Sequence, residues 1–160
     1  FSAAAVITQH DGVPTLMVRL GNDRVGRIVD AKFMVTLVRT ERSVEGTVFY
    51  RMYDLNLARA QTAALSRTYT LLHLITPESP LYGYTPARLE RDECELHVTV
   101  SGVDDTTLQP VHAIHIYADT SVRMGHRLVD VITVHPNGDL TVDLDRFHET
   151  VPDGLAGVAT

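Results

Sequence analysis

The chain has 160 residues, of which 44% are hydrophobic and 21% charged, and this supports one globular domain with its own core. The formal net charge of -6 argues against a nucleic-acid partner. No apolar run approaches the roughly 18 residues of a membrane span, and the single cysteine, Cys94, excludes an internal disulfide. Because Cys94 lies in a strand-like pattern, we expect it to be a buried structural residue.

Alternating apolar and polar residues recur along the chain between turn residues, which is typical of an antiparallel all-β sandwich. The first two strands, residues 5–9 and 15–20, flank the turn-forming pair Asp11-Gly12 and predict a hairpin. A long strand follows over residues 28–39. Its core face carries Ala31, Phe33, Val35 and Leu37, and its outer face carries Asp30, Lys32, Met34 and Thr36.

Further strands are predicted over residues 48–53, 67–75, 96–100, 111–118 and 128–134, and an Asn137-Gly138 turn leads to a last alternating stretch at 140–144. One short helix is expected over residues 85–91, because Thr85 is a good N-cap and Pro86 suits the first helical position. We place the domain at residues 1–150 and expect residues 151–160 to form a flexible tail.

Three segments give the chain a resemblance to a known family. They are the arginine-rich turn at residues 19–30, the Ser79-Pro80-Leu81-Tyr82-Gly83 turn, and residues 145–150. Together they resemble the cytoplasmic C-terminal domain of bacterial inward-rectifier potassium channels, over Phe1 to about Thr150. The resemblance implies an immunoglobulin-like β-sandwich that forms a homotetrameric ring, extends the path of potassium ions and couples to gating in a voltage-gated class of channel. It also implies a location at the cytoplasmic face of the bacterial inner membrane, with the transmembrane part upstream of Phe1.

The resemblance assigns pore-lining roles to Asp30, Gln61 and Ser101. Family members commonly have Glu at the position of Asp30, and a ring of such carboxylates concentrates cations. Strongly rectifying animal relatives have acidic residues near the other two positions, so we expect weaker block by polyamines or magnesium here. The alternative for Asp30 is a solvated carboxylate at the end of a strand.

The predicted loop at residues 101–108 matches the family's constriction at the membrane-facing mouth of the passage. The resemblance gives this gate-loop role to Gly102, Val103, Asp104, Asp105, Thr106, Thr107 and Leu108. Val103 and Leu108 are the apolar candidates for the narrow ring, and Gly102 supplies backbone freedom. The alternative is an ordinary hairpin loop.

Arg24 matches a basic residue that contacts anionic lipid headgroups in animal relatives, and Arg19 and Arg27 are assigned to the same lipid-facing basic edge. The alternative is an arginine–carboxylate pair across a subunit interface, with Asp23 or Asp11.

In the family, the turn of Ser79, Pro80, Leu81 and Tyr82 lies near the contact between neighbouring subunits. Pro80 and Tyr82 suit a rigid turn that docks on another surface. A monomeric sandwich could use the same turn to close its core.

The sequence gives little support for an enzyme, and we expect no cofactor and no metal site. His112 and His115, three residues apart on a strand, should point to opposite faces and so cannot share a metal ion. Two other functions stay open. One is a stand-alone immunoglobulin-like protein-binding module, and the other is a hydrolase in which Asp104 and Asp105 act with His112 or His115.

Overall fold

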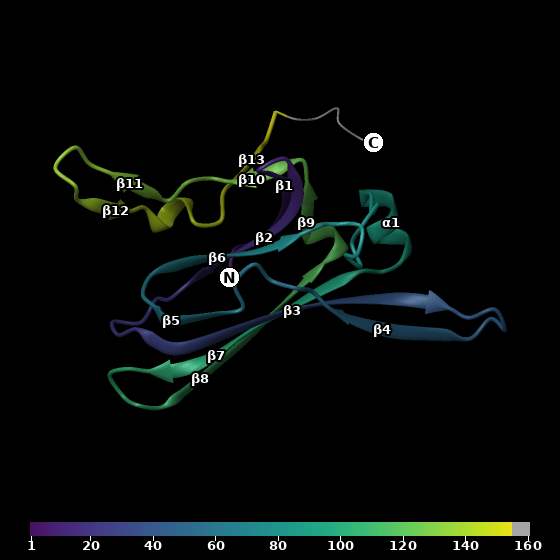
Figure 1. The fold of residues 1–160 in the computed structure, drawn as a ribbon, viewed down its shortest axis with the longest axis horizontal. Helices are drawn as coiled ribbons and strands as arrows, with labels where there is room; N and C mark the ends of the chain where they lie inside the picture. Colours follow the sequence, from purple (N-terminus) through teal and green to yellow (C-terminus); the bar gives the residue numbers. More distant parts are fainter. Residues whose placement is uncertain (155–160) are drawn as a thin grey trace.

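A computed structural model of the chain describes residues 1–154, in which the two larger β-sheets pack face to face (Figure 1). The first sheet has the strand order β6-β2-β1-β9. Its strands are β1 (Ala5–His10), β2 (Val13–Gly21), β6 (Thr68–Leu74) and β9 (Val122–Met124). All its pairs are antiparallel except that of β1 with β9, which is parallel.

The second sheet is built around the long strand β3 (Ile28–Arg42), which pairs antiparallel with β7 on one side. Its other side pairs with β5 near the start of β3 and with β4 near its end. The remaining strands are β4 (Val48–Asp54), β5 (Gln61–Leu65), β7 (Glu95–Asp104) and β8 (Pro110–Ala118). In Figure 1 the end of β3 and the start of β4 extend beyond the rest of the sheet as an arm.

The core lies between the two sheets and confirms the predicted all-β sandwich. Ala31, Phe33, Val35 and Leu37 of β3 are all at most 5% exposed, as their alternation predicted. They share one apolar cluster with residues of β2 and β7, among them Leu16, Val18, Leu96 and Val98. On the outer face Asp30, Lys32 and Met34 are exposed, but Thr36 is buried and donates a hydrogen bond to Asp54.

The single α-helix, α1 (Pro86–Arg91), begins where its sequence signals predicted. Thr85 is the N-cap, and its hydroxyl accepts a hydrogen bond from the backbone N–H of Arg88. Two short 3-10 helices cover Asp119–Ser121 and Leu144–Arg146. Cys94 follows α1 and is buried as expected, and burial raises the pKa of its thiol to about 11.

The last third of the chain differs from the prediction. The strand expected at 128–134 is two strands, β10 (His126–Leu128) and β11 (Ile132–Val134). They pair with β13 (Thr150–Pro152) and β12 (Leu140–Val142) in two separate small sheets. The first residues of the expected tail therefore belong to β13, and positions 155–160 of that tail lie outside the described residues.

Candidate functional site

A β-bulge in β3 sets the position of Asp30. The pairing of β3 with β7 shifts by one residue between Val29 and Lys32, so that Asp30 and Ala31 lie opposite the single residue Gly102. Asp30 adopts a positive φ of 50°, in the left-handed region that Asp tolerates better than most residues. A bulge of this kind redirects a side chain away from the regular alternation of a strand.

Gly102 allows the bulge because two backbones approach closely at this point. A Cβ atom at this position would lie 2.5 Å from Cγ2 of Ile28 and 2.9 Å from the carbonyl oxygen of Val29. The φ angle of Gly102 is not in the positive region, and the residue lies within β7. The prediction that Gly102 supplies backbone freedom in a loop is therefore wrong, and its role here is to leave space for β3.

A surface hollow beside the bulge brings together two of the three predicted pore-lining residues. Asp30 and Gln61 line it together with Lys32, Arg59, Thr62 and Ala63. Ser101 lies next to this group, because Lys32 is the Cα partner of Gln61 on β5 and of Ser101 on β7. Side chains directly opposite each other in an antiparallel pair point to the same face, so Gln61, Lys32 and Ser101 form one row.

The predicted gate loop is shorter than residues 101–108. Ser101 to Asp104 continue β7, and the chain turns only over residues 105–109. Val103 is half-buried, whereas Leu108 is 77% exposed and has a positive φ of 56°. The two apolar candidates for a constriction therefore differ in exposure, and of the two only Leu108 has a largely exposed side chain in this protomer.

Asp104 is buried and holds this turn in shape. Its Oδ1 accepts hydrogen bonds from the backbone N–H groups of Thr106 and Thr107, and its Oδ2 accepts one from Nη1 of Arg24 at 3.0 Å. The two backbone N–H groups, assisted by Arg24, lower the pKa of this carboxyl group. Asp105 accepts a hydrogen bond from the backbone N–H of Arg27.

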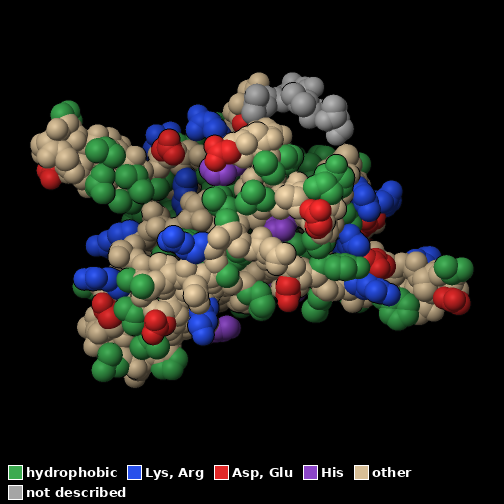
Figure 2. Space-filling model, in the orientation of Figure 1, with side chains coloured by type: hydrophobic (Ala, Val, Ile, Leu, Met, Phe, Trp, Pro, Cys, Tyr) green, Lys and Arg blue, Asp and Glu red, His purple; other side chains and the backbone are tan. Residues whose placement is uncertain are grey.

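Of the three arginines assigned to the lipid-facing basic edge, two are exposed and one is buried. Arg24 and Arg27 are exposed at the end of the molecule where the β2–β3 and β5–β6 loops lie, and Figure 2 shows Lys and Arg side chains gathered there. Arg19, in contrast, is 5% exposed and donates hydrogen bonds to the carbonyl oxygens of Phe147 and Val129. The assignment of Arg19 to a lipid-facing edge is therefore wrong, because its guanidinium group is buried against the backbone.

Within the chain, Arg24 and Arg27 have carboxylate partners that the sequence did not indicate. Arg24 pairs with Asp104 and Arg27 lies 3.9 Å from Asp105, both within the same chain. Neither pair involves Asp23 or Asp11, and the alternative of a pair with one of these residues across a subunit interface stays a prediction. The β2–β3 loop and the β7–β8 turn are thus linked by two arginine–aspartate contacts.

Two of the four residues in the predicted interface turn, Ser79 and Leu81, point inward. Ser79 is 9% and Leu81 2% exposed, so within this protomer they are core residues and the assignment of these two to a subunit contact is wrong. The Ser79 hydroxyl lies 2.7 Å from Nε2 of the buried His73. Pro80 and Tyr82, which is 56% exposed, remain available at the surface.

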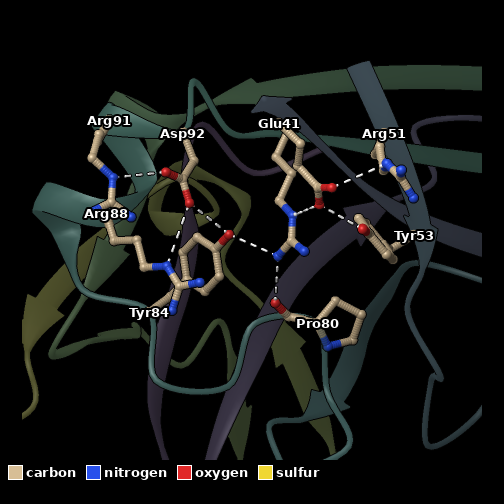
Figure 3. A network of polar contacts seen from close by, with 9 residues as sticks. Glu41, Arg51, Tyr53, Pro80, Tyr84, Arg88, Arg91 and Asp92 are labelled. Atoms are coloured by element: carbon tan, nitrogen blue, oxygen red, sulfur yellow. Dashed lines mark hydrogen bonds and ion pairs between the residues drawn. The ribbon is translucent and has the colours of Figure 1, made fainter. Parts of the chain in front are cut away.

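Arg39 connects this turn to β4 and α1 through a network that the sequence did not predict (Figure 3). It donates hydrogen bonds to Glu41, to the carbonyl oxygen of Pro80 and to the hydroxyl of Tyr84. The network continues through Tyr53 and Arg51 on one side and through Asp92, Arg88 and Arg91 on the other. The sequence did contain an indication that the Arg39 side chain points inward, because Arg39 continues the inward-facing series of odd-numbered residues in β3.

The residues named for the hydrolase alternative have other contacts among residues 1–154. His112 is exposed, whereas His115 stacks on Phe1 and contacts the Tyr117 ring, so the two lie on opposite faces as predicted. Asp104 and Asp105 are held by arginines and backbone groups. Among residues 1–154, no three side chains of His, Cys, Asp or Glu gather as a metal-binding group.

The family described as the inward rectifier potassium channel C-terminal domain matches residues 1–155. The chain belongs to this family. It is 40% identical over 149 residues to the inward rectifier potassium channel Kirbac3.1 of Paramagnetospirillum magnetotacticum, and this match covers 93% of the chain and 50% of the relative. It is 32% identical over 155 residues to the human G protein-activated inward rectifier potassium channel 1, covering 94% of the chain and 30% of the relative.

The chain of this inward rectifier domain thus spans half or less of the length of these curated relatives. In the part that the structure describes, no helix is long and apolar enough to cross a bilayer. The matching descriptions name inward rectification and, for the human relative, activation by a G protein, and none of them names voltage gating.

Proposed function

We propose that this domain forms a fourfold ring on the cytoplasmic side of a potassium channel in the bacterial inner membrane, where it extends the ion path and couples to gating. The membrane-spanning part that this function needs would belong to the same channel. The domain would carry out no bond chemistry. Its ligands would be the potassium ions in transit and, at Arg24 and Arg27, the headgroups of anionic lipids.

The observation that carries the proposal is the surface beside the β3 bulge. Asp30 and Gln61 come from different strands and line one exposed hollow, and Ser101 is in the adjacent row. The bulge turns the Asp30 carboxylate outward, and no ion pair joins it to another described side chain. Four such carboxylates around an axis would raise the local concentration of cations without binding any ion tightly.

Coupling to a gate is supported by the contacts between the basic loop and the β7–β8 turn. Arg24 and Arg27 face outward but contact Asp104, the last residue of β7, and Asp105, the first residue of the turn that would form the constriction. An anionic headgroup that attracts these arginines would compete with the two carboxylates. Lipid binding and the shape of the turn would then be linked.

The test uses the full-length channel, with Asp30→Asn as the variant and Glu90→Gln as the control, because Glu90 is exposed on α1. Single-channel potassium conductance is measured at low ionic strength, where screening is weak. We expect Asp30→Asn to lower the conductance and Glu90→Gln to leave it unchanged. Equal conductance in all three proteins at low salt, or a channel that is not tetrameric by mass measurement, would contradict the proposal.

A further inference from the structure

The wall of the proposed passage carries a cation that the family resemblance did not assign. Lys32 lies between Gln61 and Ser101 in the row that crosses β5, β3 and β7, and His112 on β8 continues this row opposite Ser101. Lys32, Gln61 and His112 are exposed and Ser101 is half-buried. If Gln61 and Ser101 face the passage, the register of the sheet requires Lys32 to face it as well.

A second cation lies in the same hollow. Arg59, exposed in the segment between β4 and β5, lines the hollow together with Asp30, Lys32 and Gln61. Among the described residues, no ion pair joins Asp30 to either cation. The hollow therefore places two cationic groups beside one carboxylate, and in the ring they would weaken the attraction that Asp30 alone would have for cations.

We propose that Lys32 and Arg59 make the passage wall selective against multivalent cations, so that Mg²⁺ and polyamines block this channel weakly. The inference rests on the proposed function, since it needs four copies around a common axis. The energy of an ion near charged groups scales with its valence, so positive charge in the wall repels a tetravalent polyamine far more than K⁺. Lys32 and Arg59 would thus permit potassium flow while opposing the blockers that an Asp30 ring alone would attract.

The test measures block of the full-length channel by spermine and by Mg²⁺, applied from the cytoplasmic side at low ionic strength. Variants are Lys32→Gln, Lys32→Glu and Arg59→Gln, and the control is Arg127→Gln, since Arg127 is an exposed cation on β10. We expect Lys32→Glu to increase the apparent affinity for spermine by about tenfold or more, with a smaller effect for Mg²⁺ because of its lower valence. Lys32→Gln and Arg59→Gln should lie between Lys32→Glu and the wild type.

Two outcomes separate this inference from the proposed function. If Asp30→Asn alters spermine block but the Lys32 and Arg59 variants act no more strongly than Arg127→Gln, the passage stands and the role of these cations is refuted. If neither the Asp30 variant nor the Lys32 variants change block, the hollow does not face the ion path and the proposed function fails together with the inference.

Discussion

The close approach of β7 to the β3 bulge makes Gly102→Ala the substitution with the most direct structural consequence. The added methyl group would lie 2.5 Å from Cγ2 of Ile28, 2.9 Å from the Val29 carbonyl oxygen and 3.3 Å from Cα of Ala31. Two of these three neighbours are backbone atoms and cannot rotate away. We therefore expect overpacking to cost about 2–3 kcal/mol.

Part of this cost is offset, because replacing Gly by Ala reduces the conformational entropy of the unfolded chain by roughly 0.4–1 kcal/mol. The free energy of unfolding should thus fall by about 1–2.5 kcal/mol. For a domain of this size, each kcal/mol lowers Tm by roughly 2–4 °C, so the expected decrease is about 2–10 °C. Calorimetry or thermal circular dichroism of the domain measures this change.

The matched control is Ser101→Ala, a change of similar size at the neighbouring half-buried position of β7. It should unfold within about 1–2 °C of the wild type. The double variant Ile28→Ala/Gly102→Ala should be less destabilised than the sum of its single changes, because Cγ2 of Ile28 is then absent. A Gly102→Ala protein with the Tm of the control would refute the argument that Gly102 is required by this close approach.

Three further predictions concern the buried polar groups. Arg39→Ala should lower the free energy of unfolding by about 2–4 kcal/mol, because the partners of Arg39 lose a half-buried cation. The control Arg51→Ala removes an exposed ion pair and should lower it by less than about 1 kcal/mol. Urea denaturation measures both changes. Arg19→Met should destabilise the domain by about 1–3 kcal/mol, because two carbonyl groups lose their hydrogen-bond donor. Binding of the domain to anionic vesicles should stay unchanged. Weaker vesicle binding would show that Arg19 does belong to the lipid-facing basic edge. Burial lowers the pKa of His73, so the unfolded chain binds a proton more readily than the folded one, and the free energy of unfolding should fall as pH decreases below about 6.5. His73→Gln should make this pH dependence weaker in urea denaturation at several pH values. An unchanged pH dependence would contradict the role given to His73.

Much of the sandwich could be predicted because its strands follow the simple period of two. The four core residues of β3 alternate without interruption, and Asp11 and Gly12 both have the positive φ values that their turn requires. The missed strand β5 has the sequence Gln-Thr-Ala-Ala-Leu, in which only Leu65 is buried, so it lacks the apolar alternation that marks a strand. It forms because β3 offers it a free edge.

The site was less predictable, because its geometry depends on contacts between distant segments. Arg24 and Asp104 are 80 positions apart, and their pairing follows from how two loops pack. The burial of Arg19 depends on carbonyl groups of residues 129 and 147, in a region where the strand prediction was itself wrong. The row that contains Lys32 depends on a bulge, whose one-residue shift no alternation pattern could indicate.

The central claim is that four protomers surround a passage into which the hollow beside Asp30 opens. Pairwise distances between spin labels at Asp30→Cys in the full-length channel test it most directly, and the buried native Cys94, whose thiol pKa is about 11, should stay unlabelled in this domain. The account predicts two short distances that differ by a factor of about 1.4, for adjacent and diagonal subunits around a fourfold axis. A single distance, or labels far apart on the outer wall of the assembly, would contradict it.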